Sequence, residues 1–596
     1  MPTYQAPLRD IRFVFHELLG VGAELRALPA FAEVDDDTVD ALLEEAGRQC
    51  AEVIAPLNQP GDEQGCRLEP GAVVRTPDGF PEAYRAWAEA GWTALACDPE
   101  YGGQGLPETL GFVLEELLSG ANVSFSLYPG LTRGAYSALH AHASDALKAR
   151  FLPQMVAGSW SGTMCLTEAQ AGTDLGLVRT RAEPQADGSY LVTGTKIFIT
   201  GGDQDLTENI VHLVLARLPD APPGIGGISL FVVPKILVND DGSLGARNAV
   251  SCGALEQKMG IKGSATCVLN FDGARGWLVG TPHKGVACMF TMMNAERLAV
   301  GIQGLGIAEV AYQNAVAYAR ERVQGRALSG TKAPEQAADP IVFHPDVRRM
   351  LLTARAVAEG CRALSIWTAL QIDTARAHPD AAAREGADDL VQLVTPIVKA
   401  AVTDLGYEVA TLCQQALGGH GYIREWGMEQ FVRDVRITQI YEGTNGVQAL
   451  DLVRRKLSLH GGRLPRRLFA LMRAWFDAHG ELPGRAEFAG PALDALARLE
   501  AVTAWLGEQA RENPDELGAA SADYLRLFAL TVLAWFWARM ADVALERVDG
   551  EDGDFYRAKL ATARFFITRM LPQTLGLEQA VRAGAAPLME LDTAAF

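Results

Sequence analysis

The hydrophobic period of this 596-residue chain changes twice, and these changes restrict the folds that it can adopt. From residue 9 to about 156, apolar residues recur every three or four positions, which is typical of helices. From about 160 to 280, short β-rich runs separated by turns predict a β-barrel or sandwich, with strands at 190–200, 210–216, 227–233 and 267–271. After Gly285 the helical spacing returns, and we expect long helices over 296–322, 347–370 and 390–417.

This order of periods predicts an α+β multidomain protein, because one hydrophobic core rarely serves a chain of this length. No Gly-x-Gly-x-x-Gly follows a predicted strand and no Gly-Lys-Ser/Thr loop occurs, so nicotinamide and ATP chemistry lose support. We expect an N-terminal helical domain at 1–160, a central β domain at 161–284, a helical bundle at 285–456 and a helical extension at 457–596.

Charge and cysteine usage exclude several classes of function. The net charge of −20 argues against nucleic-acid binding, which needs clustered Lys and Arg. The nine cysteines are scattered singly without any Cys-x-x-Cys pair, so we expect no metal site and a reducing cytoplasm. The start of the sequence lacks the pattern of a signal peptide. The apolar run 527–538 is shorter than the roughly 20 residues that span a bilayer, so a buried helix is expected there and no transmembrane segment.

One carboxylate lies in a distinctive setting, in Ile437-Thr438-Gln439-Ile440-Tyr441-Glu442-Gly443-Thr444-Asn445-Gly446. Glu442 stands between an apolar run and a glycine-containing turn. A carboxylate held partly away from water can have the raised pKa that a general base at carbon requires. Read alone, Tyr-Glu-Gly-Thr would be a solvated turn.

Several other segments support the functional interpretation, and together they resemble the flavin-dependent acyl-CoA dehydrogenase family across residues 98–446. The loop Met164–Asp174 resembles that family's Thr-Glu-Pro-x-Ala-Gly-Ser-Asp, with Ala169 in place of Pro and Thr173 in place of Ser. The strand 196–202 resembles the one whose aromatic residue, here Phe198 rather than Trp, packs on the flavin. The remaining similar segments are 99–103, 256–264, 294–297, 322–326 (with Gly325 in place of Phe) and 415–419. The length resembles a bacterial branch of about 600 residues that includes 3-(methylthio)propionyl-CoA dehydrogenases.

The resemblance implies FAD as the cofactor and Glu442 as the catalytic base. A minority of the family carries its base at the helix position occupied here by Glu296. We interpret Glu296 as an acid that lies either at the surface or behind the residues that contact the substrate. The implied substrate-binding residues are Thr173, Asn294, Arg297, Tyr441 and Gly443. The implied cofactor-binding residues are Met164, Leu166, Thr167, Thr173, Phe198, Thr200, Arg322, Gln324, Gln415, Gly419, Thr444 and Asn445.

The implied reaction is α,β-dehydrogenation of an acyl-CoA thioester to the trans-2-enoyl-CoA. Glu442 would remove the α-proton while the β-hydrogen leaves as hydride to the flavin, and the Glu442 backbone amide and a flavin hydroxyl would polarise the thioester carbonyl. Electrons would pass to an electron-transfer flavoprotein, and a bacterial cytoplasmic homodimer or dimer of dimers is expected. Two alternatives are an acyl-CoA oxidase that uses O₂ and a non-catalytic scaffold of the same fold.

Overall fold

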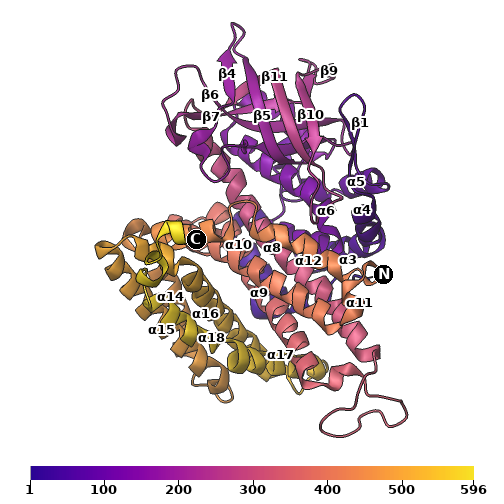
Figure 1. Cartoon of the computed structure of the whole chain (residues 1–596), viewed down its shortest axis with the longest axis vertical. Helices are drawn as coiled ribbons and strands as arrows, with labels where there is room; N and C mark the ends of the chain where they lie inside the picture. The colour runs from indigo at the N-terminus through magenta and orange to yellow at the C-terminus, as the bar shows by residue number, and fades with distance from the viewer. Residues whose placement is uncertain (1) are drawn as a thin grey trace. The chain divides into compact units, whose positions relative to one another are not determined.

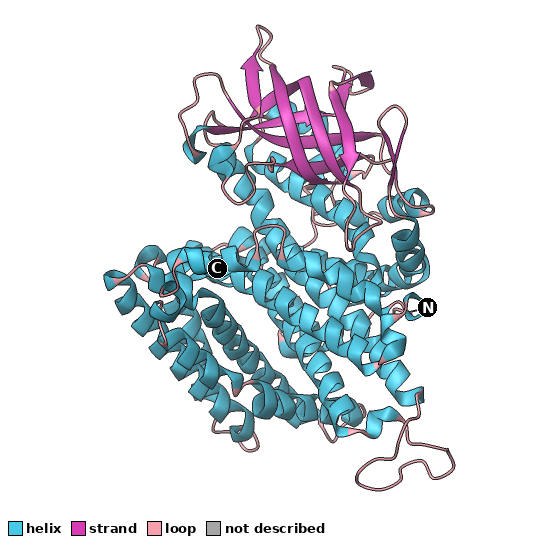
Figure 2. Ribbon diagram, viewed as in Figure 1, coloured by secondary structure: helices cyan, strands magenta, loops and turns pink. Residues whose placement is uncertain are grey.

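The computed structural model describes residues 2–596, which form two compact units (Figure 1). The sheet unit comprises Arg48–Pro107 and Leu117–Ala299. The helical unit comprises the chain up to Gly47, Glu108–Glu116 and Val300–Phe596. Figure 2 shows the large sheet in magenta and the predominantly helical remainder in cyan. The predicted α+β class, with helical segments before and after a β region in the order of the chain, is confirmed.

The main sheet of the sheet unit closes on itself. Starting from β11 (Thr266–Val279), the pairing runs through β5 (Tyr190–Thr200), β4 (Arg181–Pro184), β6 (Asn209–Arg217) and β7 (Ile228–Pro234), and β7 pairs again with β11. Two further strands extend it, β10 (Val250–Leu255) beside β11 and β3 (Trp160–Cys165) parallel to β6. The four predicted strands all lie within this sheet. Of the two predicted alternatives, a barrel and a sandwich, the closed sheet corresponds to the barrel. Short hairpins pair β1 (Arg67–Glu69) with β2 (Val73–Arg75), and β8 (Ile236–Val238) with β9 (Leu244–Arg247).

Both faces of strand β6 are buried, and its residues alternate between two cores. Val214 and Ala216 belong to the cluster inside the closed sheet, together with Phe231 and Phe271. The intervening Leu213 and Leu215 belong to the outer cluster, because side chains of a strand alternate between faces. Helices α6 (Glu108–His142) and α7 (Asp145–Val156) contribute to that outer cluster. Helices α4 (Asn58–Gln64) and α5 (Phe80–Glu89) also lie in this unit.

The helical unit is built around α8 (Gly285–Glu321), α9 (Pro345–Ala377) and α10 (Ala381–Ala416), which correspond to the three predicted long helices. Helix α8 begins at Gly285 and not at 296, because the apolar residues after Gly285 continue the helical spacing. The shorter helices are α1 (Leu8–Arg12), α2 (Val21–Arg26), α3 (Asp36–Gln49), α11 (Gly419–Tyr422), α12 (Met428–Arg436) and α13 (Asn445–Asp451).

The chain after residue 457, which belongs to the helical unit, forms helices, as predicted. It contains α14 (Arg463–His479), α15 (Ala486–Glu512), α16 (Asp515–Arg547), α17 (Gly553–Phe565), α18 (Gln573–Arg582) and α19 (Ala586–Met589). Within residues 2–596, α16 is the one helix long and apolar enough to cross a membrane, and 83% of its most apolar window is buried inside the protein. The core helix of a folded domain has the same properties, as expected for 527–538.

Helices α8 and α10 approach each other closely at glycines. A Cβ atom added at Gly406 would lie 2.6 Å from the carbonyl oxygen of Gly304, and one added at Gly301 would lie 2.7 Å from that of Val398. These distances leave no room for a side chain. Helix α8, which carries the Asn294-Ala295-Glu296-Arg297 motif, is therefore packed directly against α10.

Buried ion pairs connect distant parts of the helical unit. Arg362 is fully buried and pairs with Glu116 at 2.7 Å and Glu309 at 2.8 Å. Lys559 pairs with Asp10 at 2.5 Å and with Glu359 at 2.8 Å. Burial alone would raise the pKa of Asp10, but the charges of Lys559, Arg362 and Arg355 and the Lys559 hydrogen bond together outweigh it and lower that pKa to about 2. Helix α17 of the C-terminal part is therefore tied to α1 and α9 by charge as well as by packing.

Candidate functional site

Phe198, at the end of β5 in the sheet unit, has a strained backbone and an exposed ring. Its φ is +59°, in the left-handed region that a bulky residue rarely adopts, and its side chain is 59% exposed. The register between β5 and β11 shifts at this point, with Ile199 opposite Cys267 but Lys196 opposite Leu269. Such a bulge re-aims a side chain. The strain and the bulge together present an aromatic face to solvent, where a flat heterocycle could stack.

The loop that follows β3 is held beside this strand. The Ile197 amide donates to the Thr167 carbonyl oxygen at 2.9 Å, and the buried Lys196 Nζ donates to the Leu166 carbonyl oxygen at 2.9 Å. Met164, Thr167 and Thr200 are half-buried, and Thr173 is exposed. The structure therefore brings Leu166 and Thr167 next to the strand that carries Phe198 and Thr200.

A buried carboxylate organises the same loop. Glu168 pairs with Lys196 and also accepts hydrogen bonds from the Thr180 hydroxyl at 2.6 Å and the Arg179 amide at 2.8 Å. Burial would raise the pKa of Glu168, but the Lys196 charge and these donors together lower it to about 2. Sequence reasoning missed Lys196 and Glu168 as functional residues, because neither type signals burial.

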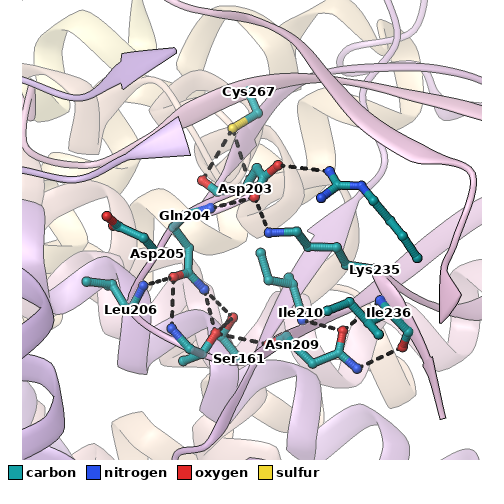
Figure 3. A network of polar contacts seen from close by, with 12 residues as sticks. Ser161, Asp203, Gln204, Asp205, Leu206, Asn209, Ile210, Lys235, Ile236 and Cys267 are labelled. Carbon is teal, nitrogen blue, oxygen red and sulfur yellow. Dashed lines mark hydrogen bonds and ion pairs between the residues drawn. The ribbon is translucent and has the colours of Figure 1, made fainter. Parts of the chain in front are cut away.

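The turn after Thr200 is fixed by a polar network centred on Asp203 (Figure 3). Asp203 is buried, accepts a hydrogen bond from Lys235 at 2.5 Å, and its amide donates to the Cys267 Sγ atom at 3.2 Å. The next residue, Gln204, donates to the Ser161 hydroxyl at 2.9 Å, which links the turn to β3. These bonds fix the turn that directly follows the strand carrying Phe198. Sequence reasoning did not identify this network.

The expected residues of α8 lie at its start, within the sheet unit. Asn294 is exposed, Arg297 is buried, and the Arg297 guanidinium donates to the Asn294 Oδ1 atom at 3.2 Å and stands over the Phe290 ring. Glu296 is only 5% exposed, which excludes the first of its two predicted alternatives, a surface acid, and leaves the second. It lies beside Gly134 of α6, where an added Cβ atom would be 2.4 Å from the Glu296 Oε1 atom.

Glu442 lies in the helical unit, in a short segment between a helical turn at Ile437–Gln439 and α13. It is half-buried, and its φ is +56°, a left-handed conformation like that of Phe198. Gly443 follows with φ +85°, and the Thr444 hydroxyl accepts a hydrogen bond from the Val447 amide and caps α13. The two consecutive left-handed residues turn the chain sharply, so that Glu442 stands at the turn.

Two neighbours of Glu442 are bonded to the surrounding helices. The Tyr441 hydroxyl donates to the Gln303 Oε1 atom of α8. Both polar atoms of the Asn445 side chain are engaged with α10, including a 2.8 Å bond from Lys399 Nζ to Oδ1. The Asn445 side chain is therefore turned toward α10 and holds the segment in place.

The residues expected to bind the dinucleotide part of the cofactor are exposed in the helical unit. Arg322, Gln324, Gln415 and Gly419 are all exposed. Gly325 has a φ of +68°, so the phenylalanine common at this position would be strained here.

The residues present fit a flavin dinucleotide on three observations. An exposed aromatic ring is available at Phe198, a guanidinium that suits a diphosphate is exposed at Arg322, and Cβ atoms added at Gly418 or Gly419 would meet no atom within 4 Å. Phe198, Thr167 and Thr200 lie in the sheet unit, whereas Arg322, Gln415 and Glu442 lie in the helical unit.

Four family models match consecutive parts of the chain. They are described as acyl-CoA dehydrogenase N-terminal domain (36–159), middle domain (163–274) and C-terminal domain (283–457), and acetyl-CoA dehydrogenase C-terminal like (468–592). A 3-methylmercaptopropionyl-CoA dehydrogenase of Ruegeria pomeroyi is 46% identical over 96% of this chain and 96% of its own length. A butyryl-CoA dehydrogenase of Syntrophomonas wolfei is 35% identical over 100% and 99%, respectively. The crystal structure of Caenorhabditis elegans ACDH-11 in complex with C11-CoA matches the fold with a TM-score of 0.76 at 19% identity, covering 99% of this chain and 96% of that one.

Proposed function

Because the chain belongs to the acyl-CoA dehydrogenase family, whose members are FAD-dependent enzymes, we propose that it converts an acyl-CoA thioester into the trans-2-enoyl-CoA with Glu442 as the base. The observation that carries this assignment is the conformation of Glu442. A left-handed conformation costs a non-glycine residue about 1–3 kcal/mol and persists only where the surroundings enforce it. Strain of this kind clusters at functional sites.

The chemistry requires a base and a polarised carbonyl. A proton on the carbon next to a thioester is weakly acidic, and its removal leaves negative charge on the carbonyl oxygen. We assign proton removal to the Glu442 carboxylate, with Tyr441 and Gly443 beside the acyl group, and stabilisation of the oxygen to the Glu442 backbone amide. Thr173, Asn294 and Arg297 are assigned to other parts of the substrate.

FAD, when bound, supplies the acceptor for the hydride that leaves the β-carbon. We assign the ring system to Phe198, Thr167 and Thr200, which the bulge of β5 and the buried Lys196 hold in place. Met164, Leu166, Thr173 and Thr444 complete this group. The diphosphate is assigned to Arg322, Gln324, Gln415 and Gly419, and we propose that these residues act toward the cofactor of a neighbouring chain in a homodimer or dimer of dimers.

For the substrate, we propose 3-(methylthio)propionyl-CoA or a short straight-chain acyl-CoA. The first is the substrate class named for the Ruegeria pomeroyi relative and the second that named for the Syntrophomonas wolfei relative, and the former is the more similar to this chain. An electron-transfer flavoprotein is the proposed acceptor. A cytoplasmic location is supported by the nine cysteines, all of which are free thiols.

The test compares two glutamates in the FAD-loaded protein under anaerobic mixing with acyl-CoA. Glu442→Gln keeps the size of the side chain but removes the proton acceptor, so the loss of flavin absorbance should slow by about 10²–10⁴-fold or more. Glu296→Gln should keep most of the rate. An active Glu442→Gln variant with an inactive Glu296→Gln variant would move the base to α8. Formation of H₂O₂ at the rate of turnover in air would show an oxidase.

A further inference from the structure

Asp404 of α10 bonds to both sides of the Glu442 segment. Its Oδ1 atom accepts hydrogen bonds from the Gln439 Nε2 atom at 2.6 Å and from the Asn445 Nδ2 atom at 2.7 Å. Gln439 stands three residues before Glu442 and Asn445 three residues after it. One carboxylate oxygen therefore joins the two ends of the turn that carries Glu442.

The orientation of the Asn445 amide is set by two opposite charges. Its oxygen accepts from the Lys399 ammonium at 2.8 Å, and its nitrogen donates to the Asp404 carboxylate. Lys399 is completely buried, which makes this polar contact costly to lose. The nitrogen also bonds to the Thr403 hydroxyl at 2.9 Å. If the amide rotated by half a turn, its nitrogen would face the Lys399 ammonium and its oxygen would face the Asp404 carboxylate. Both contacts would be repulsive, so only the observed orientation is stable.

The Gln439 amide is oriented in the same way. Its oxygen accepts from the Arg436 guanidinium at 3.0 Å, and its nitrogen donates to Asp404. Each flanking amide thus lies between a cation and the same carboxylate. Bonds to charged partners are stronger than those between neutral groups, so these contacts resist opening of the turn.

We propose that Asp404 is a positioning residue for the catalytic base: it closes the segment between Gln439 and Asn445 and thereby holds Glu442 in its left-handed conformation. This inference rests on the proposed role of Glu442. The turn itself is strained at Glu442, whose positive φ is unfavourable for a residue other than glycine. Without Asp404, the Gln439 amide loses this acceptor and the Asn445 amide keeps only the Thr403 hydroxyl and the Ala400 carbonyl, so the two ends of the turn are no longer joined through one group. The turn can then relax toward conformations in which the Glu442 carboxylate points elsewhere.

The experiment compares Asp404→Ala with Asp404→Asn in the full-length FAD-loaded protein. A displacement of about 1 Å can cost about 10²-fold in rate, so we expect Asp404→Ala to lower kcat at least about tenfold with KM little changed. Asn at this position keeps an oxygen acceptor and should recover most of kcat. Hydrogen exchange of the amides between Gln439 and Asn445 should become faster in Asp404→Ala only. The matched control is Asp388→Ala, which deletes an exposed carboxylate of the same helix and should change neither kcat nor the hydrogen exchange.

Unchanged kcat and unchanged hydrogen exchange in Asp404→Ala overturn the proposal, as does an Asp404→Asn variant as slow as Asp404→Ala. If Asp404→Ala does not retain FAD, Gln439→Ala, which removes one of the two bonds, takes its place with the same criteria. A different result would refute the assignment of Glu442 as the base. An active Glu442→Gln variant refutes the proposed base whatever Asp404 does, whereas an inactive Glu442→Gln with a fully active Asp404→Ala refutes only the positioning role.

Discussion

The Nζ atom of Lys196 lies 2.9 Å from the Oε1 atom of Glu168, in an ion pair whose side chains are 0% and 6% exposed. Lys196 belongs to the strand that presents Phe198, and Glu168 belongs to the loop that carries Thr167. The pair therefore connects the two elements to which we assign the flavin ring.

Removal of one partner of this pair should destabilise the protein strongly. Lys196→Met leaves a buried carboxylate without its cation, which typically costs about 3–5 kcal/mol. We expect a lower urea midpoint and a lower ratio of FAD to protein absorbance. The double variant Lys196→Met/Glu168→Gln removes both charges and should regain part of the loss. A single variant as stable as the wild type would contradict the structural role of the pair.

The same carboxylate predicts a pH dependence of stability. Its pKa in the folded protein is about 2, below the ordinary value of 4.5, because the Lys196 charge and hydrogen bonds outweigh the effect of burial. A lowered pKa contributes stability that is fully present above about pH 4.5 and is lost as the pH falls toward 2. The difference in free energy of unfolding between the wild type and Glu168→Gln should therefore be constant from pH 5 to 8 and shrink below pH 4.5. Urea titrations at several pH values measure it, and a difference that grows in acid would refute it.

Substitutions at Phe198 should separate backbone strain from ring stacking. Phe198→Gly removes the ring and relieves the left-handed strain, whereas Phe198→Ala removes the ring and keeps the strain. Left-handed conformation costs an L-residue roughly 1–2 kcal/mol, so the apoprotein of Phe198→Gly should be the more stable of the two. Both variants should bind FAD more weakly than the wild type, as measured by fluorescence titration. Equal FAD affinity in all three proteins would show that the ring does not stack on the cofactor.

Arg322 should affect FAD retention and assembly together. Arg322→Ala removes an exposed guanidinium that we assign to the diphosphate of a neighbouring chain's cofactor, so both flavin occupancy and the oligomer should be reduced. Arg320→Ala, the control, removes another exposed arginine, which lies in the last turn of α8 two residues before Arg322. Analytical ultracentrifugation with detection at the flavin band measures both properties at once. Full flavin occupancy in a stable assembly would rule out the cross-subunit assignment.

The sequence was informative where function depends on local pattern. The strand with Phe198 and the turn with Glu442 were both predicted from contiguous motifs, and the structure places each at a strained, accessible position. The strain itself could not be predicted, since neither phenylalanine nor glutamate favours a positive φ.

Residues that act through distant partners were missed. Asp203 is paired with Lys235, and Asp404 with Gln439 and Asn445, across separations that no local pattern encodes. For Glu296 the sequence left two alternatives, a surface acid and an acid behind the residues that contact the substrate, and its burial beside Gly134 excludes the first. The hydrogen bonds of Asn445 could not be predicted either, because its partners lie on α10, more than forty residues earlier.

The ion pair between Asp10 and Lys559 can form only late in the synthesis of the chain. The two residues are 549 positions apart in the chain. At about 5–20 residues per second, roughly half a minute to two minutes separate their synthesis. During that interval the first helix lacks its cation, and Glu359 of α9 lacks the same partner. The helical unit can therefore adopt its final packing only after α17 has left the ribosome, and a chain interrupted before that point would leave Asp10 and Glu359 without the buried cation that α17 supplies.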